Sequence, residues 1–400
     1  MKKNFSFAFI SNIISSACKF LILLLIVKLG TPSEVGIYNY ALIISAPVFL
    51  FTSLKIRSIQ VTNNNYKFNE YYSLIIILNI IALLIIVIIS LIIERNIVAY
   101  SIIILSTIKV LDNLKEVIYG LYQKHENLKL VGISIIINNI FNLIIFSIVY
   151  YSTADLIMSL TMMFLISILV FLLYDLRVLK KNYNTKLEFN IYKNDFFAIL
   201  ILAIPLSISS SLGALNTSIP RIILKNTNGE FYLGIFSAIA YILVLANLFA
   251  NSISQVFLPR LSKYFHQNNV EEFNKLANKL LVIGFIIGIL TFLITLFFGK
   301  LILNIGFGEI YSEYYLVLII LSIGLLFLLS GVFAGTVITS TGNYKVHYKI
   351  TTISLVFTVI LSILTIEKFS IYGTAFTIMF SQIVTFICYM YFFVRLKRGV

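Results

Sequence analysis

Residues 74–93 read LIIILNIIALLIIVIISLII, a continuous apolar run without a charged side chain. An α-helix needs about 20 apolar residues to cross the roughly 30 Å of hydrocarbon in a bilayer. Twelve blocks of this kind can be placed along the chain. They lie at about residues 5–29, 37–56, 74–93, 97–118, 131–151, 156–174, 196–219, 233–256, 280–303, 314–338, 350–366 and 371–394. The pattern predicts an integral membrane protein with twelve transmembrane helices.

The composition of the 400-residue chain agrees, with 60% hydrophobic and only 12% charged residues. This composition excludes a soluble globular protein. A spanning backbone must satisfy its own hydrogen bonds, and the apolar blocks are continuous instead of alternating with period two, so helices are favoured over a β-barrel. The predicted fold class is therefore an all-α polytopic membrane protein.

The formal net charge of +14 has a topological explanation. Most lysine and arginine residues fall in alternate loops, whereas the loops between them hold few. This is the distribution of the positive-inside rule, and it predicts that both termini of the multi-pass protein are cytoplasmic. Nucleic acid is therefore not an expected partner.

Catalytic and metal chemistry find little support in the sequence. His125, His266 and His347 stand alone in predicted cytoplasmic loops, so we expect solvated histidines and no metal site. Cys18 and Cys388 imply no disulfide framework. The chain has no phosphate-binding loop motif and no loop long enough for a catalytic domain. We expect no catalytic residues, no cofactor and no enzyme activity.

The longest polar stretch, residues 175–195, divides the blocks into two sets of six. We predict an N-terminal lobe over residues 1–185, which includes the cytoplasmic linker, and a C-terminal lobe over residues 186–400. The segments 34–38 (EVGIY) and 232–236 (YLGIF) open the second helix of each half. Two like-oriented halves favour a pseudo-twofold axis along the membrane normal with a cavity between the lobes. Chance similarity of two Gly-aromatic turns is the alternative.

Polar residues at membrane depth are the candidate site residues, because they cost free energy there unless they face a cavity. Asn12, Ser15, Ser16 and Lys19 fall at helical spacing on one predicted helix. Lys19 lies about 15 Å from the nearer helix end, farther than the roughly 6 Å reach of a lysine stem. We expect Lys19 to face an aqueous cavity, with a structural ion pair or a misplaced helix end as the alternatives.

Further polar groups occur on other predicted helices. One predicted helix carries four polar residues that either line a cavity or form an intrahelical charge clamp; they are Lys109, Asp112, Asn113 and Glu116. The hydroxyl-rich run 205–221, which contains Asn216, forms either a polar pore face or a tightly packed interface. Two asparagine pairs can join helices or bind sugar hydroxyls; they are Asn138 with Asn142 and Asn247 with Asn251.

Three segments carry a resemblance to a known family. They are residues 28–41 (KLGTPSEVGIYNYA), 233–238 (LGIFSA) and 256–262 (VFLPRLS). They resemble the bacterial flippases that translocate O-antigen and capsule repeat units, which belong to the multidrug, oligosaccharidyl-lipid and polysaccharide exporter superfamily. The resemblance implies two six-helix lobes that work by alternating access. The implied cargo is an undecaprenyl-diphosphate-linked oligosaccharide. The resemblance implies that the protein lies in the bacterial inner (cytoplasmic) membrane and moves this cargo from the cytoplasmic to the periplasmic or outer face of that membrane.

The anionic diphosphate of such a cargo implies cationic groups in the cavity. The candidates for the translocation cavity are Lys19, Asn12, Arg57, Lys109, Asp112, Asn216 and Arg221. Family members often carry an acidic residue just before the arginine that ends helix seven, whereas this chain has Ile219-Pro220-Arg221. We therefore do not expect Arg221 to be charge-paired.

The alternative function is a cation-coupled drug or small-metabolite exporter of the same superfamily, with Asp112 or Glu116 as the coupling acid. A membrane glycan polymerase or ligase is a third possibility. Proton antiport, sodium antiport and use of the membrane potential all stay open as the driving force. The expected partners are the undecaprenyl-diphosphate-linked glycan and membrane lipids, with the glycan polymerase and chain-length machinery as further candidates; we expect a monomer.

Overall fold

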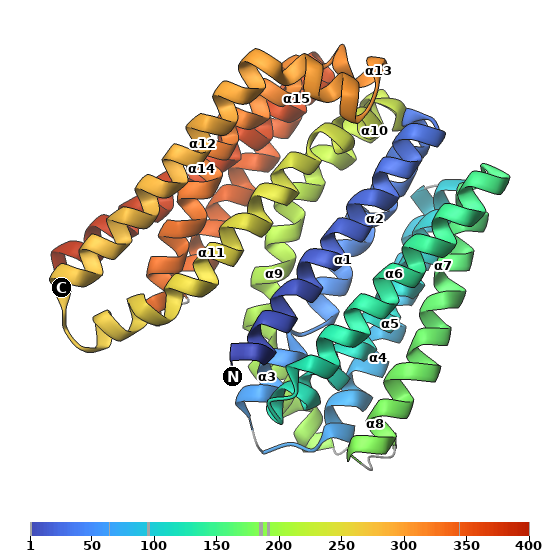
Figure 1. Ribbon diagram of the computed structural model, residues 1–400, viewed down its shortest axis with the longest axis vertical. Coiled ribbons are helices and arrows are strands. Elements are labelled where there is room, and N and C mark those ends of the chain that lie inside the picture. Colours follow the sequence, from blue (N-terminus) through green and yellow to red (C-terminus); the bar gives the residue numbers. More distant parts are fainter. Residues whose placement is uncertain are drawn as a thin grey trace. The chain divides into compact units, whose positions relative to one another are not determined.

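The computed structural model describes residues 2–63, 65–93, 97–183, 187–189, 193–343 and 345–399. All regular structure in these ranges is helical, so the predicted all-α fold is confirmed (Figure 1). Eleven stretches of the described chain are long and apolar enough to cross a membrane. The last stretch, Lys345–Arg395, contains both the eleventh and the twelfth predicted blocks.

Contacts divide the chain into two units, Met1–Ala214 and Leu215–Val400. The helices up to the division are α1 (Lys2–Leu29), α2 (Pro32–Thr52), α3 (Ile56–Thr62), α4 (Phe68–Ile93), α5 (Ile97–Lys124), α6 (Leu128–Thr153), α7 (Leu156–Val170), the π-helical η1 (Phe171–Asp175), α8 (Leu176–Tyr183) and α9 (Lys193–Asn228), inside which the division falls. The second unit continues with α10 (Glu230–Ile239), α11 (Tyr241–His266), α12 (Val270–Gly306), α13 (Glu309–Ser312), α14 (Tyr315–Ser340) and α15 (Lys345–Gly399).

The first part of α9 belongs to the first unit because of its packing. Ile199 and Ala203 are buried in one apolar cluster with Leu54, Tyr71 and Val117. The boundary predicted from the sequence, between residues 185 and 186, lies outside the described residues. The assignment of residues 1–185 and 186–400 to two lobes stays a prediction.

Local sequence explains how α1 turns into α2. The Thr31 hydroxyl accepts a hydrogen bond from the Glu34 backbone N–H at 3.3 Å, and the Glu34 carboxylate accepts from the Thr31 N–H at 2.8 Å. This reciprocal capping box satisfies two amide groups of the first turn, and Pro32 needs no hydrogen-bond partner there. A Cβ at Gly30 would clash with the Tyr150 hydroxyl, so glycine permits the close approach of α1 and α6. The family-like segment 28–41 is thus a helix-turn-helix corner.

The helix α4, which contains the run 74–93, shows why the chain requires a lipid environment. Large apolar side chains on this helix are exposed, among them Leu84 (58%), Leu91 (65%) and Ile92 (77%). Asn79, one of its buried polar residues, accepts a hydrogen bond from Asn113 at 3.0 Å. An apolar exposed face with a polar group turned inward is the pattern of a helix that contacts lipid tails.

Glycine residues allow α12 and α14 to pack closely in the second unit. A Cβ at Gly284 or Gly288 of α12 would approach the α14 backbone at Ser330 and Leu326 within 3.0 Å and 2.7 Å, respectively. Glycines at these positions let the two helices lie closer than larger residues would allow. Phe273 and Phe333 fill the adjoining core.

Candidate functional site

A cavity of about 420 Å³ lies inside the first unit. Its lining comes from α2, α3, α5 and the turn between α2 and α3, and consists of Ala46, Phe49, Leu50, Ser53, Lys55, Ile56, Arg57, Ser58, Lys109, Asp112, Asn113 and Glu116. We call it the charged cavity. On α5 the spacing of residues 109, 112, 113 and 116 places these four side chains on one helix face. Four residues predicted for the site therefore line one cavity; they are Arg57, Lys109, Asp112 and Glu116. This arrangement favours the cavity alternative over the intrahelical clamp.

Contacts with the protein fix the position of the Arg57 side chain in the charged cavity. Leu54 and Lys55 adopt left-handed backbone conformations (φ 54° and 49°), which break the chain between α2 and α3. The Arg57 Nη1 atom lies 3.6 Å from a Glu116 carboxylate oxygen, and Nε donates to the Gln123 Oε1 atom at 2.7 Å. The guanidinium carbon also lies 5.9 Å from the centroid of the Tyr119 ring. Three interactions thus fix the position of this side chain.

The other charges of this cavity are not paired in this way. Lys109 and Asp112 are half-buried, and neither forms an ion pair within 4.0 Å with any residue that the structure describes. Lys55 is exposed. Because Glu116 is paired with Arg57, the other charged residues of the lining are two lysines, Lys55 and Lys109, and one aspartate, Asp112. The lining therefore carries an excess of positive charge.

Lys19 and Asn12 are not among the residues that line the charged cavity. Both side chains are exposed on α1, whereas Ser11, Cys18 and Ile22 of the same helix are buried. Neither residue belongs to the lining of the cavities described here. Ser15, which the spacing groups with Asn12 and Lys19, is buried instead. The polar stripe of α1 is thus narrower than predicted.

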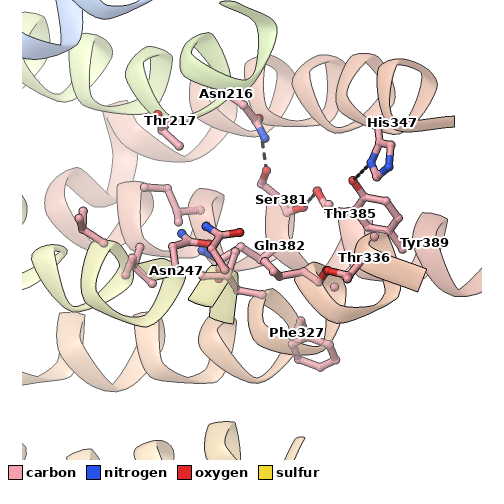
Figure 2. A pocket seen from close by; sticks show the side chains of 18 of the residues that line it. Asn216, Thr217, Asn247, Phe327, Thr336, His347, Ser381, Gln382, Thr385 and Tyr389 are labelled. Carbon is pink, nitrogen blue, oxygen red and sulfur yellow. Dashed lines mark hydrogen bonds between the residues drawn. The ribbon is translucent and has the colours of Figure 1, made fainter. Parts of the chain in front are cut away.

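A second cavity, of about 530 Å³, lies inside the second unit (Figure 2). We call it the amide cavity. Its polar lining residues come from α9, α11, α14 and α15 and are Asn216, Thr217, Arg221, Asn247, Asn251, Thr336, Thr339, His347, Ser381, Gln382, Thr385 and Tyr389. The predicted site residues Asn216 and Arg221 lie here, and the sequence also singled out the pair Asn247 and Asn251. Thr217 belongs to the predicted hydroxyl-rich run 205–221, and the other polar lining residues were not predicted for a site.

Asn216 organises one wall of the amide cavity. Its amide nitrogen donates to the Ser354 hydroxyl at 3.0 Å, and its carbonyl oxygen accepts from Thr358 and, at 3.3 Å, from Ser381. Ser354 and Ser381 also share a hydrogen bond of 3.0 Å. These contacts join α9 to both segments of α15. The side chain of Asn216 is therefore largely satisfied by the protein itself.

Arg221 sits in this lining without an acidic partner. Its guanidinium carbon lies 5.8 Å from the centroid of the Phe236 ring, and its buried Nε atom has no hydrogen-bond partner. No carboxylate of the described chain forms an ion pair with it. The sequence Ile219-Pro220-Arg221 is consistent with this unpaired state.

The prediction that His347 is a solvated loop residue is wrong. It lies in the first turns of α15 and lines the amide cavity. Its ring nitrogens hydrogen-bond to the Thr339 hydroxyl at 2.9 Å and to the Tyr389 hydroxyl at 2.8 Å. The histidine therefore fixes the Tyr389 ring as part of the wall (Figure 2).

A buried ion pair corrects the assignment of Asp175 to the polar stretch that divides the predicted halves. Lys115 and Asp175 are only 2% and 0% exposed, with 4.0 Å between the Nζ and Oδ2 atoms. Lys115 donates to the Asn138 carbonyl oxygen at 2.7 Å, and the Ser134 hydroxyl donates to Asp175 at 2.5 Å. The helical chain continues through η1 and α8 to Tyr183, so Asp175 lies inside a helix instead of beginning a loop.

Asn142 donates to the Ser167 hydroxyl at 3.0 Å. Since Asn138 is bound to Lys115, the predicted pair of Asn138 and Asn142 serves helix packing and not an open cavity. Ser211 of α9 behaves similarly, since it donates to the Pro47 carbonyl of α2 at 2.9 Å.

Solved structures of membrane transporters share this fold. An inward-facing multidrug resistance MATE family transporter of the MOP superfamily superposes with a TM-score of 0.79 at 13% identity, covering 96% of this chain and 95% of that one. The lipid II flippase MurJ in an inward closed conformation gives a TM-score of 0.78 at 16% identity, covering 96% of this chain and 86% of that one. The fold is therefore that of the MOP-superfamily transporters.

Residues 1–265 match the family described as polysaccharide biosynthesis protein. The chain is also 51% identical over 396 residues to the capsular polysaccharide biosynthesis protein CapF of Staphylococcus aureus, covering 99% of this chain and all of that protein. The chain belongs to this polysaccharide biosynthesis family, and it is a multi-pass membrane protein.

Proposed function

We propose that this protein is a flippase that moves a lipid-linked oligosaccharide across the bacterial cytoplasmic membrane. The proposed cargo is an undecaprenyl-diphosphate-linked repeat unit, taken from the cytoplasmic to the outer face by alternating access. The termini are proposed to lie in the cytoplasm. The family membership and the MurJ-like fold support this class of function.

The charged cavity is the observation that carries the proposal. A diphosphate is a compact anion, and cations that lack an acidic partner stabilise it far better inside a membrane protein than in water. Lys109 and Lys55 form no ion pair within 4.0 Å with a described residue, and the fixed guanidinium of Arg57 adds a directional donor. A cationic drug would meet repulsion in the same place, which favours the lipid-linked anion over the exporter alternative.

Asp112 is the proposed coupling acid. Glu116 is engaged by Arg57 at 3.6 Å, whereas Asp112 faces the cavity without an ion pair to any described residue. An acid that is not committed to a partner is freer to exchange a proton or a cation during transport. Asp112→Asn should therefore reduce transport without preventing binding of the cargo.

Lys109→Met in a strain that depends on this protein for its surface polysaccharide tests the proposal. Loss of one charge-assisted contact should lower polysaccharide output by about 10-fold or more, because such contacts contribute about 1.5–3 kcal/mol. Lys129→Met is the matched control, since Lys129 is exposed on α6 and outside the cavity. Normal polysaccharide from the Lys109 variant, at equal protein level in the membrane, would contradict the assigned role.

A further inference from the structure

We propose that the amide cavity of the second unit binds sugar residues of the translocated glycan and determines which glycan the protein accepts. This inference rests on the proposed function, because it assumes that a lipid-linked glycan is the cargo. It assigns glycan recognition to a cavity that is distinct from the charged cavity of the first unit.

The chemistry of the lining fits a polyhydroxylated ligand. Among the described residues, no carboxylate and no lysine lines the amide cavity. Its polar groups are amides, hydroxyls, His347 and one arginine, and apolar side chains such as Leu243 and Ile378 lie between them. Side-chain amides offer donors and an acceptor at fixed spacing, and hydroxyls act as either, so the set matches adjacent hydroxyl groups of a sugar ring. The volume of about 530 Å³ lies within the roughly 300–1,000 Å³ of ligand pockets.

Part of this hydrogen-bonding capacity is open. The side chains of Asn247 and Asn251 form no hydrogen bond with any residue in the described ranges; Asn247 is half-buried and Asn251 is exposed. The Gln382 Oε1 atom is buried against Gly324 of α14 without a hydrogen-bond partner. Figure 2 shows Asn247 and Gln382 at the same part of the cavity. Buried polar groups are normally satisfied by protein, water or ligand. Asn216, by contrast, is already hydrogen-bonded to Ser354 and Ser381. Protein contacts therefore hold this wall in place, and the other side-chain amides of the lining are available to bind a ligand.

A lipid tail is a poor occupant for this space. An apolar chain would leave the open amides without hydrogen bonds, at a cost of about 1–3 kcal/mol for each group. The same unit holds a separate cavity of about 290 Å³ with an almost wholly apolar lining, which includes Leu245, Ile253, Ile287 and Phe333. Polar and apolar spaces are therefore segregated within the unit, and the polar space suits the sugars.

Aromatic rings complete the proposed sugar site. Tyr389 is held by the hydrogen bond between its hydroxyl and the His347 Nδ1 atom, and Phe327 lines the same cavity. The apolar face of a sugar ring packs against such rings while its hydroxyls reach the amides. His347 is thus a positioning residue that acts through Tyr389.

Arg221 provides a place for one anionic group. Its buried Nε atom lacks a partner, and an arginine binds carboxylate and phosphate oxygens through paired hydrogen bonds. The anion is either the diphosphate of the lipid carrier or an acidic group on the sugar, and the binding experiment distinguishes the two.

The test compares two ligands on the purified full-length protein in lipid nanodiscs. One ligand is the lipid-linked repeat unit extracted from cells that lack this protein, and the other is undecaprenyl diphosphate without sugar. Asn247→Ala and Gln382→Ala should weaken binding of the glycan-bearing lipid by about 3- to 10-fold, which corresponds to one hydrogen bond, and leave binding of the bare lipid unchanged. Neither change removes a hydrogen bond within the described protein, so folding should be preserved.

Gln255→Ala is the control, because Gln255 is exposed on α11, the helix that carries Asn247. Equal weakening of both ligands, or no weakening of either by folded variants, would overturn the sugar site. If the unaltered protein bound neither lipid, the proposed function itself would fail. Arg221→Gln assigns the anion: loss of affinity for both ligands indicates the diphosphate, loss for the glycan-bearing lipid alone indicates an acidic sugar, and no loss removes Arg221 from the site.

Discussion

The cationic side chains of this protein differ in whether other protein groups pair with their charge. Lys115 is buried against Asp175 and Asn138, and Arg57 is held by Glu116 and Gln123. Lys19, in contrast, is an exposed cation in the middle of a membrane-spanning helix. A paired, buried cation most directly serves structure, whereas an unpaired cation at membrane depth requires another explanation. We propose that Lys19 contacts the anionic cargo.

Replacement of Lys19 by alanine tests this role. The variant should lower surface polysaccharide by about 10-fold or more in a strain that depends on this protein, with an unchanged level of protein in the membrane. Lys300→Ala, an exposed lysine near the end of α12, is the control. Normal polysaccharide in the Lys19 variant would remove this residue from the proposed site.

The Lys115 and Asp175 pair makes a different prediction, which concerns stability. Lys115→Met leaves a buried carboxylate without its cation and should destabilise the protein by about 3–5 kcal/mol. The double variant Lys115→Met with Asp175→Leu removes both charges and should recover much of this loss. Denaturation of the purified variants in detergent provides the measurement, and a single variant as stable as the unaltered protein would contradict it.

At the scale of elements, α15 consists of two helical segments that meet at Ser370. This residue has φ 49° and ψ −125°, outside the helical region. The turn brings the segments together near Gly373, where a Cβ would lie against the Thr365 carbonyl. The Thr365 hydroxyl also hydrogen-bonds to the Thr377 hydroxyl at 2.9 Å. Glycine is therefore required for the two segments to pack.

Gly373→Ala should destabilise the protein by about 1–3 kcal/mol, since the added methyl group meets backbone that cannot move away cheaply. Gly213→Ala is the matched control, because no atom lies within 4 Å of a Cβ at that position. The control should be neutral or stabilising by up to about 1 kcal/mol in the interior of α9. Comparison of the two melting temperatures in detergent tests the prediction, and equal melting temperatures would count against it.

Most helices could be predicted from the sequence because hydropathy alone reports them. The helical extent beyond each apolar core could not, because polar residues such as Asp175 look like loop residues until their partners are known. The spacing of Leu176 and Leu179 continues the helical period of the preceding block, and Leu179 is indeed buried. That period was the available signal for α8 and for the burial of Asp175.

Candidate residues that share one helix were easier to group than residues from several helices. Lys109, Asp112 and Glu116 follow helical spacing on α5, so the sequence placed them together. His347 and Tyr389 are 42 residues apart, and their hydrogen bond depends on how α15 folds back at Ser370. No periodicity in the sequence reports such a contact, and for this reason most of the amide cavity was missed.

At the scale of the whole molecule, each unit encloses a polar cavity with its own chemistry. The cavity of the first unit carries lysine, arginine and acidic groups, whereas that of the second carries amides, hydroxyls and one arginine. A lipid-linked glycan has the same two components, an anionic diphosphate and neutral or weakly charged sugars. Outward movement of its anionic part is assisted by an inside-negative membrane potential.

Transfer of the cargo between leaflets is the central claim, and a reconstitution measures it most directly. Liposomes with the purified protein receive a lipid-linked repeat unit in one leaflet, and its appearance in the other leaflet is followed over time. The proposed flippase predicts transfer much faster than in protein-free liposomes, slowed about 10-fold or more by Lys109→Met and unchanged by Lys129→Met. Transfer by the unaltered protein that is no faster than in protein-free liposomes would contradict the account.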